Sequence, residues 1–395
     1  MVSRAEFHVR MAPIVHSPSA ALAEPRAPAA QPRVEGRPPC LRIGVFSYRL
    51  PVAGQKRGGI ERVAHDLADG LGRRGHEVTV FSHDPRPPGA AYAVAGLPWR
   101  RFVDSWIGRR VTMGYLGNVL WLLPRVSGFD VLMTHGDSLL LPLKGKPFVR
   151  VMHGSAREEA ASATSVGRRL LQAGVYVQEL AGAALHTATV GVSANTRLAN
   201  RFVRHVIPNG VDRRVFHPGA ALRDDRPALV FVGTLGGRKR GAWLLDLFDA
   251  VIRPRVPRAE LHMVCPHGPE RAGVTYHVGV SDATLAALYC RAWLCVSPSA
   301  YEGFGLPYAE ALACGTPVVA TPNPGSHEVL ATGGGVLASD EAFATTVVAL
   351  LTDDLRRRAL EEEARARAGD HDLETTIDAY EAVLLSLLRG DGQTA

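Results

Sequence analysis

Two glutamates stand eight positions apart in the string SPSAYEGFGLPYAEALACGTPVVAT, which covers residues 297–321. Glu302 follows a short apolar run that favours a strand. Glu310 falls one turn into a helix that Pro307 suits at its beginning and Gly315 at its end. Carboxylates accept paired hydrogen bonds from vicinal hydroxyls, so this arrangement favours a ligand with two hydroxylated rings, such as a hexose and a ribose.

The turn between the two glutamates has the sequence Gly303-Phe304-Gly305. Glycines allow backbone amides to approach a ligand closely. The helix that begins near Leu306 presents free N–H groups and the positive end of its dipole, and both attract phosphate. Together these features predict a sugar-nucleotide site. The alternative is a pair of glutamates that only cap helices or form salt bridges.

This string resembles the donor-site signature of retaining glycosyltransferases of family 4, also called glycosyl transferases group 1, which have the GT-B fold. The signature is a glutamate, seven residues and a second glutamate around an FGLP-like turn, and the resemblance covers about residues 41–385. It implies that Glu302 contacts the transferred sugar and that Glu310 binds the ribose hydroxyls. It also implies that the turn amides of Phe304, Gly305 and Leu306 contact the sugar and the diphosphate.

Three adjacent cations, Arg238, Lys239 and Arg240, follow Gly233 in the string GTLGGRKRG. The resemblance implies that this segment holds the diphosphate. Many relatives have an arginine where this chain has Thr234, but a subgroup reads GTL followed by Arg-Lys. We therefore assign the phosphate role to Arg238 and Lys239, with Arg240 as the competitor for the role of the lysine. A solvated basic loop is the alternative.

Residues of the first half also match the family. Gly58-Gly59 resembles its amino-terminal glycine turn, near donor phosphate and acceptor, although an ordinary loop-to-helix turn is the alternative. His153, in VMHGS, resembles the histidine that many relatives place beside the donor sugar, and His135, in THGD, is a weaker candidate; a buried structural histidine is the alternative for both. The candidate catalytic residues are Glu302, His153, Arg238 and Lys239. The candidate donor-binding residues are Gly59, Gly233, Arg238, Lys239, Arg240, Val278, Glu302, Gly303, Phe304, Gly305, Leu306 and Glu310.

The elements that must position these residues alternate between short apolar runs and amphipathic helices. Residues 41–48 predict a buried parallel strand, and six apolar residues from Ile60 to Leu71 form one helical stripe before a strand at residues 78–82. This is the βαβ unit of a doubly wound fold, and it restarts at residues 228–233. Further strands are predicted at residues 131–134, 148–152, 187–192, 260–264, 275–278, 294–297 and 317–320, and helices at 282–291, 306–314 and 373–388.

We therefore expect an α/β protein of the GT-B class, with two Rossmann-like domains that face each other across a cleft. Ligands of such sheets bind at the carboxyl ends of the strands. The expected parts are a disordered leader at residues 1–38, an acceptor-side domain at 39–212, a nucleotide-sugar domain at 213–371, and a last helix at about 372–390 that packs back on the first domain. An over-extended gene start, with Met11 as the initiator, is the alternative for the leader.

The charge is unevenly distributed. Residues 41–212 hold 22 basic and 12 acidic residues, whereas residues 213–395 hold 18 and 23. No nucleic-acid-binding motif accompanies the basic half, so an anionic membrane surface or a phosphate-bearing acceptor fits better than nucleic acid. Between Leu97 and Arg125, Trp99, Trp106 and Trp121 alternate with arginines; this segment suits an anionic lipid surface or, equally, a core helix with basic edges.

No apolar run reaches the ~18–20 residues of a membrane span. The five cysteines form no CxxC pair, which favours reduced thiols in a cytosolic protein. We expect a cytoplasmic location, with a peripheral position on the inner face of the plasma membrane as a further hypothesis.

The expected reaction is retaining transfer of a hexosyl unit from a UDP-, GDP- or dTDP-sugar to a hydroxyl of a lipid-linked acceptor in a bacterial cell envelope. A small natural product is the alternative acceptor, and a non-catalytic partner protein with the same fold is the alternative of another class. No metal or other cofactor is expected, because cations and helix-terminal amides can neutralise the leaving diphosphate. Asp370-His-Asp372 is interpreted as solvated helix caps, and the four lysines offer no pyridoxal site.

Overall fold

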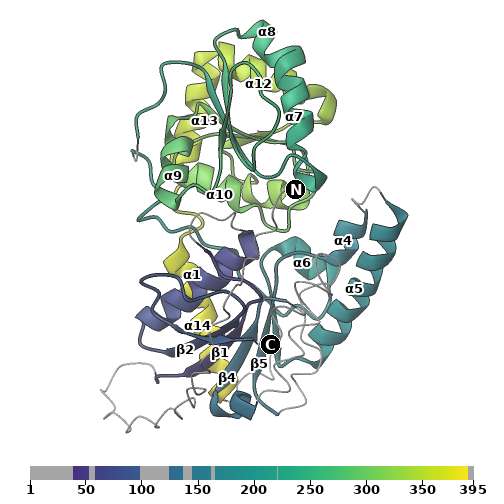
Figure 1. The fold of residues 1–395 in the computed structure, drawn as a ribbon, viewed down its shortest axis with the longest axis vertical. Helices are drawn as coiled ribbons and strands as arrows, with labels where there is room; N and C mark the ends of the chain where they lie inside the picture. Colours follow the sequence, from purple (N-terminus) through teal and green to yellow (C-terminus); the bar gives the residue numbers. More distant parts are fainter. Residues whose placement is uncertain are drawn as a thin grey trace, which may run out of the picture. The chain divides into compact units, whose positions relative to one another are not determined.

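The computed structural model of this chain describes residues 39–52, 58–97, 124–136, 145–161, 165–219 and 221–389. Within these ranges the chain forms two parallel sheets with helices packed against them (Figure 1). This is the predicted α/β architecture of two Rossmann-like units. The expected leader, and the aromatic and basic segment after Leu97 up to residue 123, lie outside the described residues.

The first sheet has the strand order β3-β2-β1-β4-β5-β6-β7, and each pair of neighbours is parallel. β4, β5 and β6 are buried at every position, as expected for parallel strands that are covered on both faces. The strands are β1 (Arg42–Phe46), β2 (Glu77–Ser82), β3 (Ala93–Gly96), β4 (Val131–Thr134), β5 (Phe148–Met152), β6 (Ala188–Gly191) and β7 (His205–Val206).

The helices associated with this sheet include one from the end of the chain. α1 buries its predicted stripe, and α14 packs on it so closely that a Cβ added at Gly70 would lie 2.2 Å from Ile377 Cδ1. Arg74, which follows α1, forms an ion pair with Glu381 of α14 at 2.8 Å. The helical segments are α1 (Gly59–Arg73), η4 (Pro124–Gly128), α4 (Ala156–Ala161), α5 (Val166–Leu185), α6 (Ala194–Ala199) and α14 (Leu373–Arg389).

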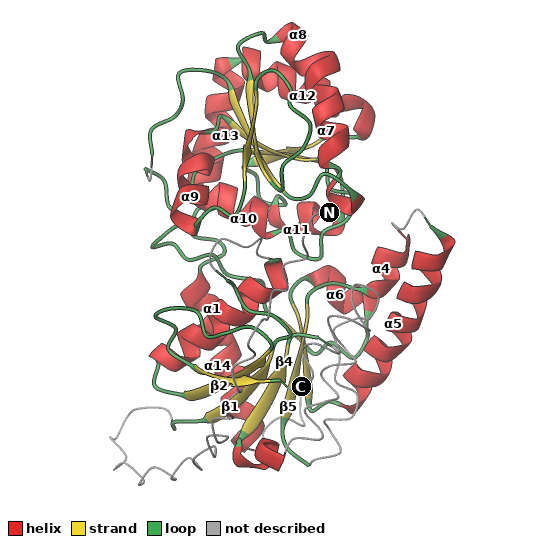
Figure 2. Ribbon diagram, viewed as in Figure 1, coloured by secondary structure: helices red, strands yellow, loops and turns green. Residues whose placement is uncertain are grey.

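The second sheet has the strand order β10-β9-β8-β11-β12-β13, again with parallel neighbours. Figure 2 shows its strands surrounded by helices. Its strands are β8 (Ala228–Val232), β9 (Glu260–Val264), β10 (Val274–His277), β11 (Leu294–Ser297), β12 (Val318–Ala320) and β13 (Gly335–Leu337). Its helical segments are η6 (Gly237–Lys239), α7 (Gly241–Leu247), η7 (Phe248–Ile252), α8 (Arg253–Arg255), α9 (Asp282–Arg291), α10 (Leu306–Ala313), α11 (Pro324–Val329), α12 (Asp340–Thr352) and α13 (Asp354–Ala366).

The chain passes between the two sheets twice, and the two crossings are hydrogen-bonded to each other. Val211 N donates to His371 O at 2.7 Å, and Leu373 N donates to Val211 O at 3.1 Å. A Cβ added at Gly210 would lie 2.4 Å from the Cα of Leu373. The absence of a side chain at Gly210 therefore permits this close pairing of the two segments.

The sequence predicted most of these elements. The strands predicted at residues 148–152 and 260–264 coincide with β5 and β9, and the helix predicted at 282–291 coincides with α9. Three short strands of two to four residues, β3, β7 and β13, were not predicted. All five cysteines are free thiols and four of them are buried, as expected for a reduced protein. None of the described helices is long and apolar enough to cross a membrane.

Candidate functional site

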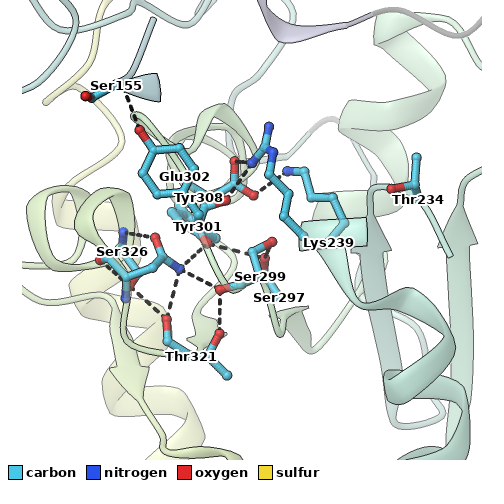
Figure 3. A network of polar contacts seen from close by, with 12 residues as sticks. Ser155, Thr234, Lys239, Ser297, Ser299, Tyr301, Glu302, Tyr308, Thr321 and Ser326 are labelled. Carbon is cyan, nitrogen blue, oxygen red and sulfur yellow. Dashed lines mark hydrogen bonds and ion pairs between the residues drawn. The ribbon is translucent and has the colours of Figure 1, made fainter. Parts of the chain in front are cut away.

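Glu302 lies in the loop that follows β11, and two cations hold its carboxylate (Figure 3). Arg238 Nη1 is 2.7 Å from Oε2, and Lys239 Nζ is 2.5 Å from Oε1. Arg238 Nη1 also donates to Tyr301 O at 2.6 Å. The side chain of Glu302 is 6% exposed. The structure thus brings together three of the four candidate catalytic residues.

Burial alone would favour the protonated form of Glu302, but its pKa lies below the ordinary value. Burial raises the pKa, and the positive charges of Lys239 and Arg238, together with their hydrogen bonds, outweigh it. Glu302 is therefore an anion held between two cations. The same two cations offer a positive site for a second anion, such as a diphosphate.

The turn after Glu302 makes a close contact with the loop that follows β5. A Cβ added at Gly303 would lie 2.0 Å from His153 O, so only glycine fits at this position. Gly305 has a φ of +96° and precedes the first residue of α10, Leu306. A glycine is required there because left-handed backbone strains other residues.

Glu310 lies inside α10, and residues from two other helices bind its carboxylate. Arg62 Nη1 of α1 is 2.6 Å from Oε1, and the hydroxyl of Tyr289 in α9 donates to Oε2 at 2.9 Å. The pKa of Glu310 is raised, because burial outweighs the charge of Arg62 and the hydrogen bond from Tyr289. Both carboxylate oxygens therefore have a partner before any ligand binds. Arg62 also lies near two more carboxylates, those of Asp66 and Asp282.

Two histidines at the ends of neighbouring strands contact each other: His135 follows β4, and His153 follows β5. His135 Nδ1 and His153 Nε2 are 2.9 Å apart, and the rings stack with their centroids 5.1 Å apart. Burial lowers the pKa of His153 to about 4, and burial and the neighbouring His153 lower the pKa of His135. The pair is thus neutral at pH 7. In the loop after β5, which contains His153, Ser155 N donates to the hydroxyl of Tyr301 at 2.9 Å, which links this loop to the residue before Glu302.

A buried polar network supports the loop that contains Glu302 (Figure 3). The side-chain amide of Asn323 donates to Ser299 O at 3.0 Å and to the hydroxyl of Tyr308 at 3.2 Å. Asn323 also caps α11 together with Ser326, each side chain accepting from the backbone N–H of the other. This network fixes both ends of the segment at residues 299–308, so that Glu302 does not depend on its cations alone for its position.

The remaining candidate donor-binding residues have different contacts and positions. Arg240 has a φ of +55° and forms a two-point ion pair with Asp340, at 2.8 and 2.7 Å, while its guanidinium lies over Trp243. The structure thus pairs Arg240 with Asp340 and pairs Lys239 with Glu302. Gly59 begins α1, and a Cβ added to it would lie 3.7 Å from Leu306 Cδ1. Two more candidates lie at strand ends: Gly233 follows β8, and Val278, 50% exposed, follows β10.

Two family models match successive parts of the chain. The model described as "Glycosyltransferase Family 4" matches residues 57–215, and the model described as "Glycosyl transferases group 1" matches residues 226–353. The chain belongs to glycosyltransferase family 4. The first match contains Arg62 and His153, and the second contains Lys239 and both glutamates.

Relatives of known name agree with this family. The MMP alpha-(1->4)-mannosyltransferase of Mycolicibacterium hassiacum is 35% identical over 42% of this chain and 43% of its own length. The phosphatidyl-myo-inositol mannosyltransferase of Mycobacterium tuberculosis is 27% identical over 80% of this chain and 89% of its own length. The match therefore spans less than half of the first protein and most of the second.

Solved structures share the fold. The sucrose-phosphate synthase of Thermosynechococcus elongatus superposes with a TM-score of 0.70 at 20% identity, over 88% of this chain and 99% of that one. This likeness shows the two-sheet GT-B architecture of the family 4 chain.

The segment Asp370-His371-Asp372 has structural contacts in this family 4 chain. The ring of His371 packs edge-on against Phe304, 5.2 Å between centroids, and Asp372 pairs with Val211 across the two crossings. Within the described ranges no cluster of three or more His, Cys, Asp or Glu side chains could hold a metal ion.

Some residues of the site were not among the candidates. Arg62, Tyr289, Tyr301 and Asn323 all contact the glutamates or support their loop. Arg62 lies beside the glycine turn in the string GGIER, which was the one available signal in the sequence. The tyrosines and the asparagine have no distinctive spacing, so only the folded chain identifies them.

Proposed function

We propose that this chain transfers a hexosyl unit from a nucleotide-diphosphate sugar to a hydroxyl acceptor, with retention of the anomeric configuration. The observation that carries the proposal is the buried Glu302 carboxylate, held by Lys239 at 2.5 Å and Arg238 at 2.7 Å beside the amino end of α10. Two cations and a helix terminus next to one carboxylate suit a ligand that has a diphosphate attached to a sugar.

In the proposed reaction the diphosphate oxygens bind Lys239 and Arg238, so that Glu302 becomes available to the hydroxyls of the transferred sugar. The bond between the anomeric carbon and the diphosphate oxygen then breaks, and the two cations neutralise the charge that develops there. The acceptor oxygen bonds to the anomeric carbon from the same face. The departing phosphate oxygen takes the proton of the acceptor hydroxyl. No covalent sugar–enzyme intermediate is required.

Glu310 is proposed to bind the ribose hydroxyls. Its carboxylate lies one helical turn behind the amino end of α10, and Tyr289 and Arg62 fix its direction. His153 is proposed to lie beside the donor sugar, because its backbone contacts Gly303. As a neutral ring it can exchange hydrogen bonds with a sugar hydroxyl without adding charge.

The acceptor is proposed to be a lipid-linked molecule of a bacterial cell envelope, reached at the inner face of the plasma membrane. One relative supports a lipid acceptor by name, the phosphatidyl-myo-inositol mannosyltransferase, and both relatives reported above are named as mannosyltransferases. Mannose is therefore the first sugar to be tested. A small soluble acceptor is the competing substrate class.

The test is incubation with a panel of UDP-, GDP- and dTDP-sugars, with nucleotide release and thermal shift as readouts. We expect one nucleotide class to shift the melting temperature and to be released. A Glu302→Gln variant should still bind the sugar nucleotide and show a thermal shift. It should form free nucleotide only slowly, because transfer of the sugar is impaired. The matched control is Glu362→Gln, at an exposed glutamate of α13, which should behave as wild type. Release with no lipid present, but with a soluble alcohol acceptor, would favour the competing substrate class.

The panel also tests the class of the protein. If no sugar nucleotide shifts the melting temperature and none is released, the result would support a non-catalytic partner protein. An inverted anomer in the product, determined by NMR, would overturn the same-face mechanism.

A further inference from the structure

α5 exposes an apolar face that nothing in the proposed catalytic site uses. Val166, Leu170, Leu171, Val177 and Leu185 are all exposed, from 48% to 71%. We call these five residues the α5 apolar face. At about 100° per residue, Val166, Leu170 and Val177 fall on one side of the helix. Leu171 and Leu185 lie next to them and widen this side. Of the large apolar residues that the described part of the chain exposes, half belong to this single helix.

The opposite side of α5 is fixed to the first sheet. Gly182 and Ala183 are buried, the hydroxyl of Tyr176 donates to Ala199 O at 2.8 Å, and Arg150 Nη1 donates to Glu179 O at 2.8 Å. The helix is therefore held in one orientation. The α5 apolar face does not arise from a loosely packed segment that could turn inward.

A shallow groove continues the apolar surface from α5 toward α6. It has a volume of about 470 Å³, and its lining includes Leu180, Leu198 and Phe202. Leu198 is 84% exposed. Clustered exposed apolar residues mark docking surfaces, whereas single ones do not.

The charges around this surface are predominantly positive. All the arginines of α4, α5, α6 and the turn after α6 are exposed, whereas the glutamates of the same segment are partly buried and bonded within it. Glu159 pairs with Arg168 at 2.6 Å, and Glu179 accepts from Ala156 N at 3.1 Å. The exposed arginines are Arg157, Arg168, Arg169, Arg197, Arg201 and Arg204.

We infer that the α5 apolar face and its surrounding arginines dock the protein on an anionic lipid surface. An apolar stripe bordered by arginines suits the boundary between acyl chains and negative headgroups. A second copy of this chain is disfavoured as the occupant, because a two-fold contact through the same face brings the arginines of both copies together.

The inference deepens the acceptor side of the proposed function. α4 begins three residues after His153, and Ala156 at its start is bonded to Glu179 of α5. The docking surface is thus built on the loop that contacts Gly303. A protein held through α5 would present this loop near the membrane from which a lipid-linked acceptor comes.

The test is flotation of the full chain with vesicles of phosphatidylcholine alone or with 30% phosphatidylglycerol. We expect binding to the anionic vesicles only, weakened by salt. A variant with Leu170→Glu and Val177→Glu should lose binding. Neutralising Arg197 and Arg201 with glutamine should weaken it by about fivefold per arginine. The control is Leu355→Glu, on an 84% exposed leucine of α13, which should float as wild type.

Three results would overturn the inference: no binding to anionic vesicles, equal binding by the Leu170/Val177 variant, or a dimer in sedimentation that this variant dissolves. Circular dichroism should show that all variants fold, since the replaced side chains are exposed. The thermal shift caused by a sugar nucleotide should be unchanged in all of them. If no sugar nucleotide shifts the melting temperature of the wild type, the proposed function is refuted, whereas lost flotation would refute only the docking surface.

Discussion

The side chains of Glu302 and Glu310 are only 6% and 5% exposed and lie in one short segment, yet their surroundings shift their pKa values in opposite directions. Two cations from η6 lower the pKa of Glu302, so it stays ionised despite its burial. A single arginine from α1 and a phenol only partly compensate the burial of Glu310, and its pKa is raised.

The difference concerns which part of the chain neutralises each carboxylate. Arg238 and Lys239 belong to the same sheet unit as Glu302, so its charge is balanced within that unit. Arg62 follows the first strand of the other sheet, so the balance at Glu310 depends on contact between the two units. Glu302 is therefore suited to a constant electrostatic role in transfer, and Glu310 to a binding role that responds to closure of the two units.

The largest effect is expected at Glu302. In Glu302→Gln the side chain keeps its shape but loses its charge, and Lys239 and Arg238 lose their common counter-ion. We expect kcat to fall by about 100- to 1000-fold, with a smaller change in donor KM. Initial rates of nucleotide release measure both, with Glu362→Gln as the control. A wild-type kcat would remove Glu302 from the reaction and end the contrast between the two glutamates.

A second test separates the two units at their closest contact. In Gly303→Ala the new Cβ would lie 2.0 Å from His153 O, and a backbone atom cannot move aside cheaply. We expect kcat/KM to fall by up to about 100-fold, because a displacement of about 1 Å at the site is that costly. Gly128→Ala, in η4, is the control, since a Cβ there would meet nothing within 4 Å. Equal activities of the two variants would show that the contact at Gly303 does not matter for transfer.

The balance at Glu310 is tested by removing its partner. Arg62→Met leaves Glu310 buried without a cation, so its pKa should rise further and its protonated form should bind ribose hydroxyls less well. We expect donor KM to rise about tenfold and the free energy of unfolding to fall by about 3 kcal/mol. Denaturant unfolding and initial rates measure the two effects.

Two further variants interpret that result. Arg62→Lys should recover most of the loss, and adding Glu310→Gln to Arg62→Met should restore part of the stability. A lower donor KM in Arg62→Met would mean that Arg62 competes with the ribose for Glu310 instead of orienting it.

The sequence predicted the unit around Glu302 better than the contacts between units. The glutamates, the glycine turn and the adjacent cations lie in two short strings whose residue types suit one ligand. The contact between Arg62 and Glu310 joins residues 248 positions apart. Helical periodicity identifies the buried stripe of α1, but it does not say which partner a charged residue at the edge of that stripe will meet.

The missed elements have different physical causes. β7 has two residues and β13 has three, too few to establish an alternating or continuous apolar pattern. In α5 the large apolar residues lie on the exposed side and small ones such as Ala183 are buried. A prediction from apolar periodicity would therefore place the wrong side of α5 in the core.

The smallest effect is expected on the free energy of unfolding when the pH is lowered. Its pH range distinguishes the histidine pair from Glu302. The pKa of His153 is lowered to about 4 by burial, so an unfolded chain binds more protons than the folded one between that value and the ordinary value of about 6.5. The stability that this histidine contributes is complete above pH 6.5 and is lost as the pH falls toward 4, by up to about 1.4 kcal/mol per pH unit. The lowered pKa of Glu302 acts in a more acidic window, below its ordinary value of 4.5.

Unfolding free energies measured between pH 6.5 and 5 therefore include the contribution of the histidine pair, together with those of other groups with shifted pKa values such as His262 and Glu310. His153→Asn should flatten the slope in this range, and His135→Asn should do the same, because burial also lowers the pKa of His135. The exposed His327, changed to asparagine, is the control. If neither variant has a smaller slope than the wild type, the pair does not stay neutral in the folded chain. The contact at Gly303 would then carry a charge from the first unit, and Glu302 would not be balanced by its own unit alone.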